Sequence, residues 1–436
     1  MDQDKSFTNF LVVWGGQLVS SIGSGMTAFS LVVYAFERTR LATNVALITL
    51  LSFLPSILLR PIGGVLADRF DRRAMMIIGD LGSASGVVFI LLTMLFGDVD
   101  MWHIYAGVTV SSIFVALQSP AYKASATDWL TEEQYSKGSG LVQLAESSKF
   151  LLSPFIAGTL FSFSNIETVL AVDIGTFVVA VFAVLVIKKQ MKRSEQGAET
   201  GHWMKDLAEG WRAIVSNRGV ALLILVISVV TFYLGFLQTL IGPMVLSFAD
   251  ARTLGTIQSV SAVGMLISSM LIGMFSMGHR YMDMLVIGLV IAGLALSLMG
   301  VTTNVHFIIA AGFLFLSALP FVNASADVLI RRNIPNDKQG RVWGIIGILS
   351  QLGFIVAYGI SGLLADHVFN PFLEEGGLLA SSVGHVIGTG PGRGIGLMFI
   401  IAGILVVVMA LITSGVRPIR ALATSASVVN AGGSAQ

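Results

Sequence analysis

The sequence predicts an all-α polytopic membrane protein, and its composition and hydrophobic pattern carry this prediction. Of its 436 residues, 55% are hydrophobic and 12% are charged. A soluble domain carries roughly 25% charged residues, because its surface must be solvated. Apolar stretches of about 20 residues, the length that crosses a bilayer, recur along the chain. Cysteine is absent, which excludes disulfide frameworks and cysteine metal sites.

Twelve apolar stretches of spanning length can be marked from the sequence. The segment Met1–Thr8 is short and polar, and the long apolar stretch behind it predicts a first spanning helix rather than a cleaved signal. Several stretches contain Gly or Pro, which spanning helices tolerate when neighbours satisfy the freed backbone groups. The predicted spans are 10–36, 42–66, 74–96, 102–127, 138–162, 166–187, 219–247, 253–276, 281–301, 305–329, 341–365 and 396–415.

The positions of Lys and Arg predict the orientation of the chain. With the N-terminus in the cytoplasm, most of the 26 basic residues fall in cytoplasmic segments. The outer segments then hold four of them, Arg38, Arg40, Arg252 and Arg393. Because short cytoplasmic loops are enriched in Lys and Arg, this bias predicts a multi-pass protein of the plasma (inner) membrane with both termini inside.

A polar segment after the sixth predicted span divides the chain into two halves. It opens with the basic run Lys188–Arg193, and Trp203, Leu207, Trp211 and Ile214 then recur at helical spacing. This pattern predicts an amphipathic helix on the membrane surface. The predicted organisation is a six-helix bundle, a linker with this helix, a second six-helix bundle and a cytoplasmic tail, over residues 1–187, 188–218, 219–415 and 416–436.

The two halves resemble each other in register. The polar stretch 131–140 matches 335–344 at an offset of 204 residues, and the small-residue patch 157–160 matches 361–364 at the same offset. Paired turn-rich loops and small-residue patches favour a parallel six-plus-six duplication. Chance similarity between apolar segments is the alternative.

The predicted loop between the second and third spans carries the strongest local motif. On charge alone, Gly64-Val-Leu-Ala-Asp-Arg-Phe-Asp-Arg-Arg73 is an ordinary loop rich in arginine at the cytoplasmic surface. Its order resembles the loop signature of the major facilitator superfamily, with Asp71 in place of the second glycine. The resemblance assigns the motif to Gly64, Asp68, Arg69, Arg72 and Arg73. The degenerate copy in the second half has Met277 in place of the acid.

The fifth predicted span contains a second motif. Ser153, Pro154 and Gly158 resemble the antiporter motif of drug–proton exporters, although two of its three glycines are replaced. A kinked helix that packs through small residues is an equal alternative. The arrangement of the whole chain resembles the twelve-helix drug efflux branch of the superfamily, which includes macrolide exporters and, more distantly, siderophore exporters.

Ionisable residues inside the predicted spans are candidates for proton coupling, because each is costly there. Glu146 and Lys149 lie three residues apart, so we expect them to share a helix face and pair. Asp80 and Arg60 lie near the cytoplasmic surface, where a local ion pair or snorkelling is expected. Asp173 has apolar and small neighbours in sequence, which favours a neutral acid able to carry a proton.

Lys123 and Asp327 occupy equivalent positions of the two halves. Their opposite charges could form an ion pair that closes the cytoplasmic mouth, with separate headgroup contacts as the alternative. The candidate proton carriers are therefore Glu146, Asp173 and Asp327.

Polar and aromatic residues of several spans are candidates for solute contact. They combine amides with rings, which suits a bulky amphipathic solute better than a sugar or a small anion. The candidates are Gln17, Gln143, Phe232, Tyr233, Phe236, Gln238, Asn323 and Tyr358.

The resemblance implies a monomeric secondary transporter that exports amphipathic, macrolide-like molecules by alternating access and proton antiport. Export of a siderophore or lipid, or a receptor that has lost transport, are the alternatives. The sequence has no G-x-x-x-x-G-K-[ST] loop, so ATP hydrolysis on this chain is not expected. The glycine run 388–394 is expected to be a flexible outer loop. No enzyme activity, cofactor, metal or nucleic-acid partner is expected; the expected partners are the bilayer, the solute and protons.

Overall fold

The computed structural model describes residues 7–187, 203–275, 280–335 and 338–423, and these residues form helices and connections without strands. The chain divides into two compact units. Unit 1 comprises residues 1–199 and 249–259, and unit 2 comprises residues 200–248 and 260–436. The basic run Lys188–Arg193, Met277 and the tail beyond residue 423 lie outside the described residues.

Unit 1 is built from long apolar helices joined by short connections. Its elements are α1 (Phe7–Thr39), α2 (Ala42–Arg69), α3 (Arg72–Phe96), α4 (Met101–Trp129), the 3₁₀ turn η1 (Glu132–Gln134), α5 (Tyr135–Leu151), α6 (Ser153–Phe161) and α7 (Ile166–Val186). The connections α1–α2 and α2–α3 have two residues, and α3–α4 and α6–α7 have four.

The helices of unit 1 pack around α1, α3 and α4. Helix α1 contacts α7, α5 and α6, while α3 packs against α4 and α7, and α2 against α4. At the end of the unit that holds the α2–α3 loop, Phe10, Met76, Trp129 and Val184 are buried in one apolar cluster. This cluster joins α1, α3, α4 and α7, so the α2–α3 loop lies next to a tightly packed part of unit 1.

The fifth predicted span, 138–162, is two helices rather than one. Leu152 separates α5 from α6, and Pro154 lies in the first turn of α6. Proline lacks a backbone N–H and fits a first helical turn, where no intrahelical acceptor is needed. The break therefore has a local cause.

Unit 2 contains the remaining long helices and a folded connection near its C-terminal end. Its elements are α8 (Trp203–Ser216), α9 (Arg218–Leu246), most of α10 (Ala251–Met274), α11 (Tyr281–Val301), α12 (Val305–Asn333), α13 (Gln339–Leu364), the π-turn η3 (Ala365–Phe369), α14 (Asn370–Leu373), α15 (Gly384–Ile387) and α16 (Arg393–Gly415).

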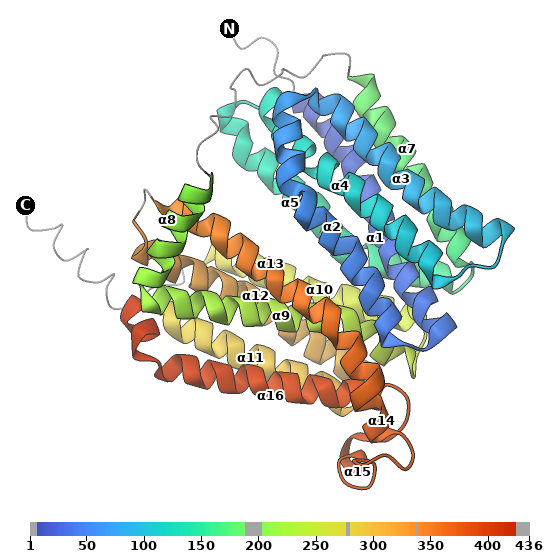
Figure 1. Cartoon of the computed structure of the whole chain (residues 1–436), viewed down its shortest axis with the longest axis vertical. Coiled ribbons are helices and arrows are strands. Elements are labelled where there is room, and N and C mark those ends of the chain that lie inside the picture. Colours follow the sequence, from blue (N-terminus) through green and yellow to red (C-terminus); the bar gives the residue numbers. More distant parts are fainter. Residues whose placement is uncertain (1–6, 188–202, 276–279, 336–337, 424–436) are drawn as a thin grey trace, which may run out of the picture. The chain divides into compact units, whose positions relative to one another are not determined.

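Helices α11 and α16 pack along their length through glycines (Figure 1). A Cβ on Gly300 would overlap the carbonyl oxygen of Gly396, and a Cβ on Gly403 would overlap that of Gly293. Small residues allow helix backbones to approach closely where apolar burial alone gives little driving force. These glycines therefore set the spacing of the two helices.

The segment predicted to be an amphipathic helix forms α8, which packs against α13 and α9. Ile214 is buried, whereas Trp211 and Val215 are exposed. Glu209 pairs with Arg341 of α13, with an Oε2–Nη1 distance of 2.6 Å. Apolar packing and this ion pair hold α8 on unit 2.

Eleven helices in the described part of the chain are long and apolar enough to cross a membrane. They correspond to eleven of the twelve predicted spans, and the broken pair α5 and α6 accounts for the twelfth. The all-α, twelve-span prediction is confirmed in outline.

Candidate functional site

The α2–α3 loop is fixed by its charged residues to two other helices of unit 1. Asp71 accepts a hydrogen bond from the backbone N–H of Arg73, at 3.0 Å, and caps α3. Arg72 pairs with Asp128 of α4 at 3.1 Å and also donates to the carbonyl of Ala124. Asp71, where the superfamily signature has glycine, therefore has a defined role as a helix cap.

Arg73 joins the same loop to the last turn of α7. Its Nε donates to the carbonyl of Val184 at 3.1 Å, and its Nη2 donates to that of Leu185 at 2.6 Å. The carbonyls at a helix C-terminus lack intrahelical donors and carry partial negative charge, so a guanidinium suits them. The loop thus connects α3, α4 and α7 into one body.

The other motif residues of the loop are less enclosed. Asp68 and Arg69 are exposed on unit 1. A Cβ on Gly64 would meet open space, while one on Gly63 would overlap the carbonyl of Ala116. The close approach of α2 to α4 is therefore made at Gly63 and not at the motif residue Gly64.

The fifth-span motif packs α6 against two helices. Ser153 donates to the carbonyl of Ile22 on α1 at 2.8 Å. A Cβ on Gly158 would lie 2.7 Å from the carbonyl oxygen of Ala251, at the start of α10. Residues 249–259 accordingly group with unit 1. Pro154 and Gly158 allow both the helix break and this close backbone contact.

Asp173 of α7 is buried among hydroxyl groups. Its side chain is 1% exposed. Oδ1 accepts from Thr176 at 3.2 Å and from Ser24 of α1 at 3.5 Å, while Oδ2 has no hydrogen-bond partner. The hydroxyl of Thr27 on α1 is also buried, and it lies beside this carboxyl group. Lys149 of α5 also interacts with Asp173 through its charge. A carboxyl group with an unpaired oxygen accepts a hydrogen bond when it is ionised and can donate one when it carries a proton.

Glu146 forms an ion pair with Lys123 instead of the expected Lys149. The distance from Oε1 of Glu146 to Nζ of Lys123 is 2.7 Å, and both side chains are about half exposed. Lys149 extends its stem along α1, where a Cβ on Gly25 would lie 2.9 Å from its Cγ. The expected helix-local pair is therefore replaced by a pair between α4 and α5.

Asp80 is part of a buried chain of polar side chains across three helices. Gln118 of α4 donates to Gln17 of α1 at 2.7 Å, and Gln17 donates to Asp80 of α3 at 2.9 Å. Asp80 is 3% exposed, so the expected snorkelling or local ion pair is wrong. Gln17 is buried as well and its amide is engaged at both ends, which leaves it little capacity to contact a solute. The sequence analysis did not select Gln118, because its only distinguishing feature there is that it is a polar residue within a predicted span.

Several proposed solute contacts cluster on α9 and α13 of unit 2. Tyr358 donates to Gln238 at 2.7 Å, and the rings of Phe232 and Tyr233 meet edge to face at 5.3 Å. Phe236 stacks on Phe232 at 6.1 Å. Tyr358 and Phe236 are buried, Phe232 and Tyr233 are half-buried, and Gln238 is exposed. The accessible part of this cluster is two rings and one amide.

The remaining charged and amide candidates lie apart from that cluster. Gln143 of α5 and Asn323 of α12 are exposed, and Asp327 of α12 is half-buried. Asp327 precedes Arg331 by four residues on the same helix, a spacing that favours pairing.

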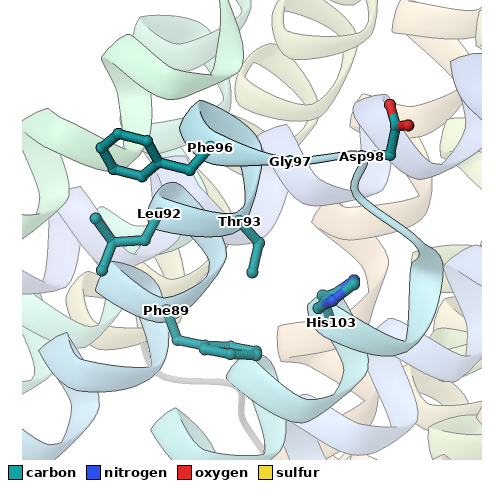
Figure 2. Close-up of a pocket in the computed structure, with 7 residues that line it drawn as sticks. All are labelled: Phe89, Leu92, Thr93, Phe96, Gly97, Asp98 and His103. Carbon is teal, nitrogen blue, oxygen red and sulfur yellow. The ribbon is translucent and has the colours of Figure 1, made fainter.

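A recess of about 370 Å³ lies where α3 ends and α4 begins (Figure 2). Phe89, Leu92, Phe96 and His103 line it. Figure 2 shows the carboxylate of Asp98 pointing away from these rings. Because Phe96 and Leu92 are largely exposed apolar side chains at a helix end, contact with lipid explains this recess better than recognition of a polar solute.

Comparison with known proteins places the chain in a family. The model of the Major Facilitator Superfamily matches residues 13–357, and the chain belongs to this superfamily. It is 24% identical over 418 residues to macrolide efflux protein A of Streptococcus pyogenes, covering 95% of this chain and 97% of that protein. It is also 22% identical over 331 residues to the staphyloferrin B transporter of Staphylococcus aureus, covering 70% and 74%.

The fold agrees with that of solved transporters. The crystal structure of the nucleoside transporter NupG superposes with a TM-score of 0.72 at 12% identity, covering 92% of this chain and 97% of that chain. At this identity the likeness concerns the fold. The chain is a membrane-inserted transporter of the superfamily, and macrolide efflux proteins are among its relatives.

Proposed function

We propose that this protein exports amphipathic small molecules of the macrolide type, in exchange for protons and by alternating access. The observation that carries the proposal is the near full-length match to macrolide efflux protein A. The cluster of Phe232, Tyr233 and Gln238 supports it, since rings with one amide suit a large solute that is mostly apolar. A monomer in the plasma membrane with both termini inside is part of the proposal.

Among the three candidate acids, Asp173 best fits a proton carrier. Glu146 is already engaged in an ion pair with Lys123. Asp173 is enclosed, has an unpaired oxygen and is approached by hydroxyls rather than by a cation within hydrogen-bond distance. A proton entering this site would neutralise a buried carboxylate, on which Lys149 acts only through its charge and not through a hydrogen bond.

Proteoliposomes provide the test of export. Purified protein is reconstituted, a pH gradient is imposed, and movement of a radiolabelled macrolide is followed with and without an uncoupler. We expect macrolide movement that depends on the gradient. Movement that is unchanged by the uncoupler would refute proton coupling, and absence of macrolide movement would refute the proposed substrate class.

Export of a siderophore is the second candidate, supported by the match to the staphyloferrin B transporter. The same proteoliposomes distinguish the two, with staphyloferrin B as the alternative solute. Binding of either solute without movement would favour a receptor.

The proposed cytoplasmic gate of Lys123 and Asp327 now has a competitor in Glu146, which pairs with Lys123. We expect that exchanging charges, Lys123→Asp with Asp327→Lys, restores transport that either single change removes. The parallel exchange Lys123→Glu with Glu146→Lys is the matched comparison. Rescue by the second exchange and not by the first would show that Glu146 is the functional partner of Lys123. It would refute the proposed gate between Lys123 and Asp327.

A further inference from the structure

The connection between α13 and α16 is folded around a small apolar core of its own. It is not the flexible loop that was expected from the glycine run 388–394. Leu373, Ile387 and Leu397 are buried together in a small apolar core. Gly388, Gly390 and Gly392 have φ angles of 89°, 106° and 77°, a region that residues with a Cβ rarely adopt. These glycines let the chain turn tightly over the first residue of α16.

Arg393, the first residue of α16, is a buried cation with an incomplete set of partners. It is 4% exposed, and its Nη2 donates to the carbonyls of Gly300 and Val301, at 2.8 and 3.2 Å, where α11 ends. Nε and Nη1 are buried and have no hydrogen-bond partner. Carbonyls at a helix C-terminus compensate part of the charge, but unpaired buried donors on a cation remain costly.

The acidic residues nearby do not neutralise Arg393. Glu374 and Glu375 in the same connection are exposed, and no carboxylate of the described residues forms an ion pair with Arg393. The buried guanidinium therefore carries a net positive charge that the protein itself leaves unmatched.

The start of α16 adds backbone donors beside this guanidinium. Gly392 is the N-cap in left-handed conformation and offers no side chain to cap the helix. The first-turn amides of Gly394 and Ile395 have no acceptor within the helix. At 23 residues, α16 is long enough for its dipole to place positive potential at this end.

The glycine turn passes close to the unpaired donor. A Cβ on Gly388 would lie 3.6 Å from Nε of Arg393, and one on Gly390 would meet nothing within 4 Å. The glycine turn and the unpaired Nε of Arg393 thus meet at one point, the start of α16.

We propose that this point is a binding site for a small oxyanion, a phosphate or carboxylate group, held by Arg393 and the first turn of α16. Oxyanions accept several charge-assisted hydrogen bonds, which matches an Arg with free N–H groups at a helix N-terminus. The charge bias of the loops predicts that the site faces outward. The anion could be the phosphate of a lipid headgroup or a free ion, and the site does not depend on what the protein exports.

Thermal unfolding of the purified full-length protein in detergent tests the proposal. We expect Tm of the wild type to rise by about 3 °C or more, in a saturable manner, when sodium phosphate replaces sodium chloride at equal ionic strength. Arg393→Gln should lose this rise, whereas Arg252→Gln, which changes an exposed arginine, should keep it.

A second experiment with lipids distinguishes a free anion from the phosphate of a lipid headgroup. The same proteins are placed in nanodiscs of phosphatidylcholine with or without phosphatidylglycerol, and bound lipid is counted by native mass spectrometry. Stabilisation by inorganic phosphate supports a free anion, and selective retention of phosphatidylglycerol by the wild type but not by Arg393→Gln supports a headgroup. A wild type that responds to neither, or an Arg393→Gln variant that responds equally, would overturn the site. If Arg393→Gln does not fold, Arg393→Lys takes its place, with a weakened response expected because lysine cannot donate in the same directions.

Discussion

At the residue scale, some buried polar groups have hydrogen-bond partners within the fold and others retain atoms without a partner. Asp80 is satisfied through Gln17 and Gln118. Asp173 and Arg393 each retain buried atoms without a partner. Because an unsatisfied buried polar group destabilises the fold, those that persist are candidates for binding a proton or a ligand.

Replacement of Asp173 tests its role as a proton carrier. We expect Asp173→Asn to abolish solute movement driven by a pH gradient while leaving solute binding within about 2-fold of the wild type, since the amide keeps the size of the acid but cannot exchange a proton. Transport and equilibrium binding are measured on the same preparation. Glu133→Gln, at an exposed position, is the matched control. Gradient-driven movement that survives Asp173→Asn excludes Asp173 as the carrier.

Arg72 and Arg69 allow a comparison of two arginines within one loop. Arg72 is enclosed and paired with Asp128, whereas Arg69 is exposed. Removal of one partner of an enclosed ion pair costs up to about 3 kcal/mol, since the other charge is left uncompensated. We therefore expect Arg72→Ala to lower the apparent Tm clearly and Arg69→Ala to change it little. Equal shifts for the two variants would contradict the structural role of the Arg72–Asp128 pair.

At the element scale, close packing of helices depends on particular glycines. Several glycines of the chain face open space, but those between α11 and α16 face the backbone of the partner helix. Sequence composition does not distinguish the two kinds, because both lie in apolar helices. Their consequences for stability should differ in sign.

Substitution of one glycine of each kind gives a direct test. Gly403→Ala would overlap the carbonyl of Gly293 and should destabilise the protein by about 1–3 kcal/mol through overpacking. Gly175→Ala on α7 meets open space and should be neutral or stabilising by up to about 1 kcal/mol, because alanine favours a helix. Apparent Tm in detergent measures both. A stable Gly403→Ala protein would mean that α11 and α16 can separate without cost.

At the scale of the whole molecule, the chain is a transporter with two compact units of apolar helices. Its orientation is a prediction from the distribution of Lys and Arg. The absence of cysteine makes single-cysteine variants directly informative about this orientation.

Labelling of intact cells with a membrane-impermeant maleimide tests the orientation. Ser381 is exposed in the connection before α16, and Ser136 is exposed at the start of α5. If both termini are cytoplasmic, Ser381→Cys should react in intact cells, and Ser136→Cys should react only after the cells are permeabilised. The reverse pattern would invert the predicted topology.

The sequence by itself determined the membrane class, the spans, the amphipathic helix α8 and the superfamily. These features follow from composition, the length of apolar segments and local motifs, all of which act along the chain. The sequence did not show that Gly63 rather than Gly64 lies against α4, because that depends on how one helix fits against another.

Tertiary structure decided which polar groups meet. Glu146 pairs with Lys123 on another helix rather than with Lys149 one turn away, and Gln118 reaches Gln17 across the bundle. Arg393, expected in a flexible loop, became the buried first residue of α16. Partners of this kind lie far apart in sequence, so the charge or hydrogen bond that each residue receives is set by packing and not by its neighbours in the chain.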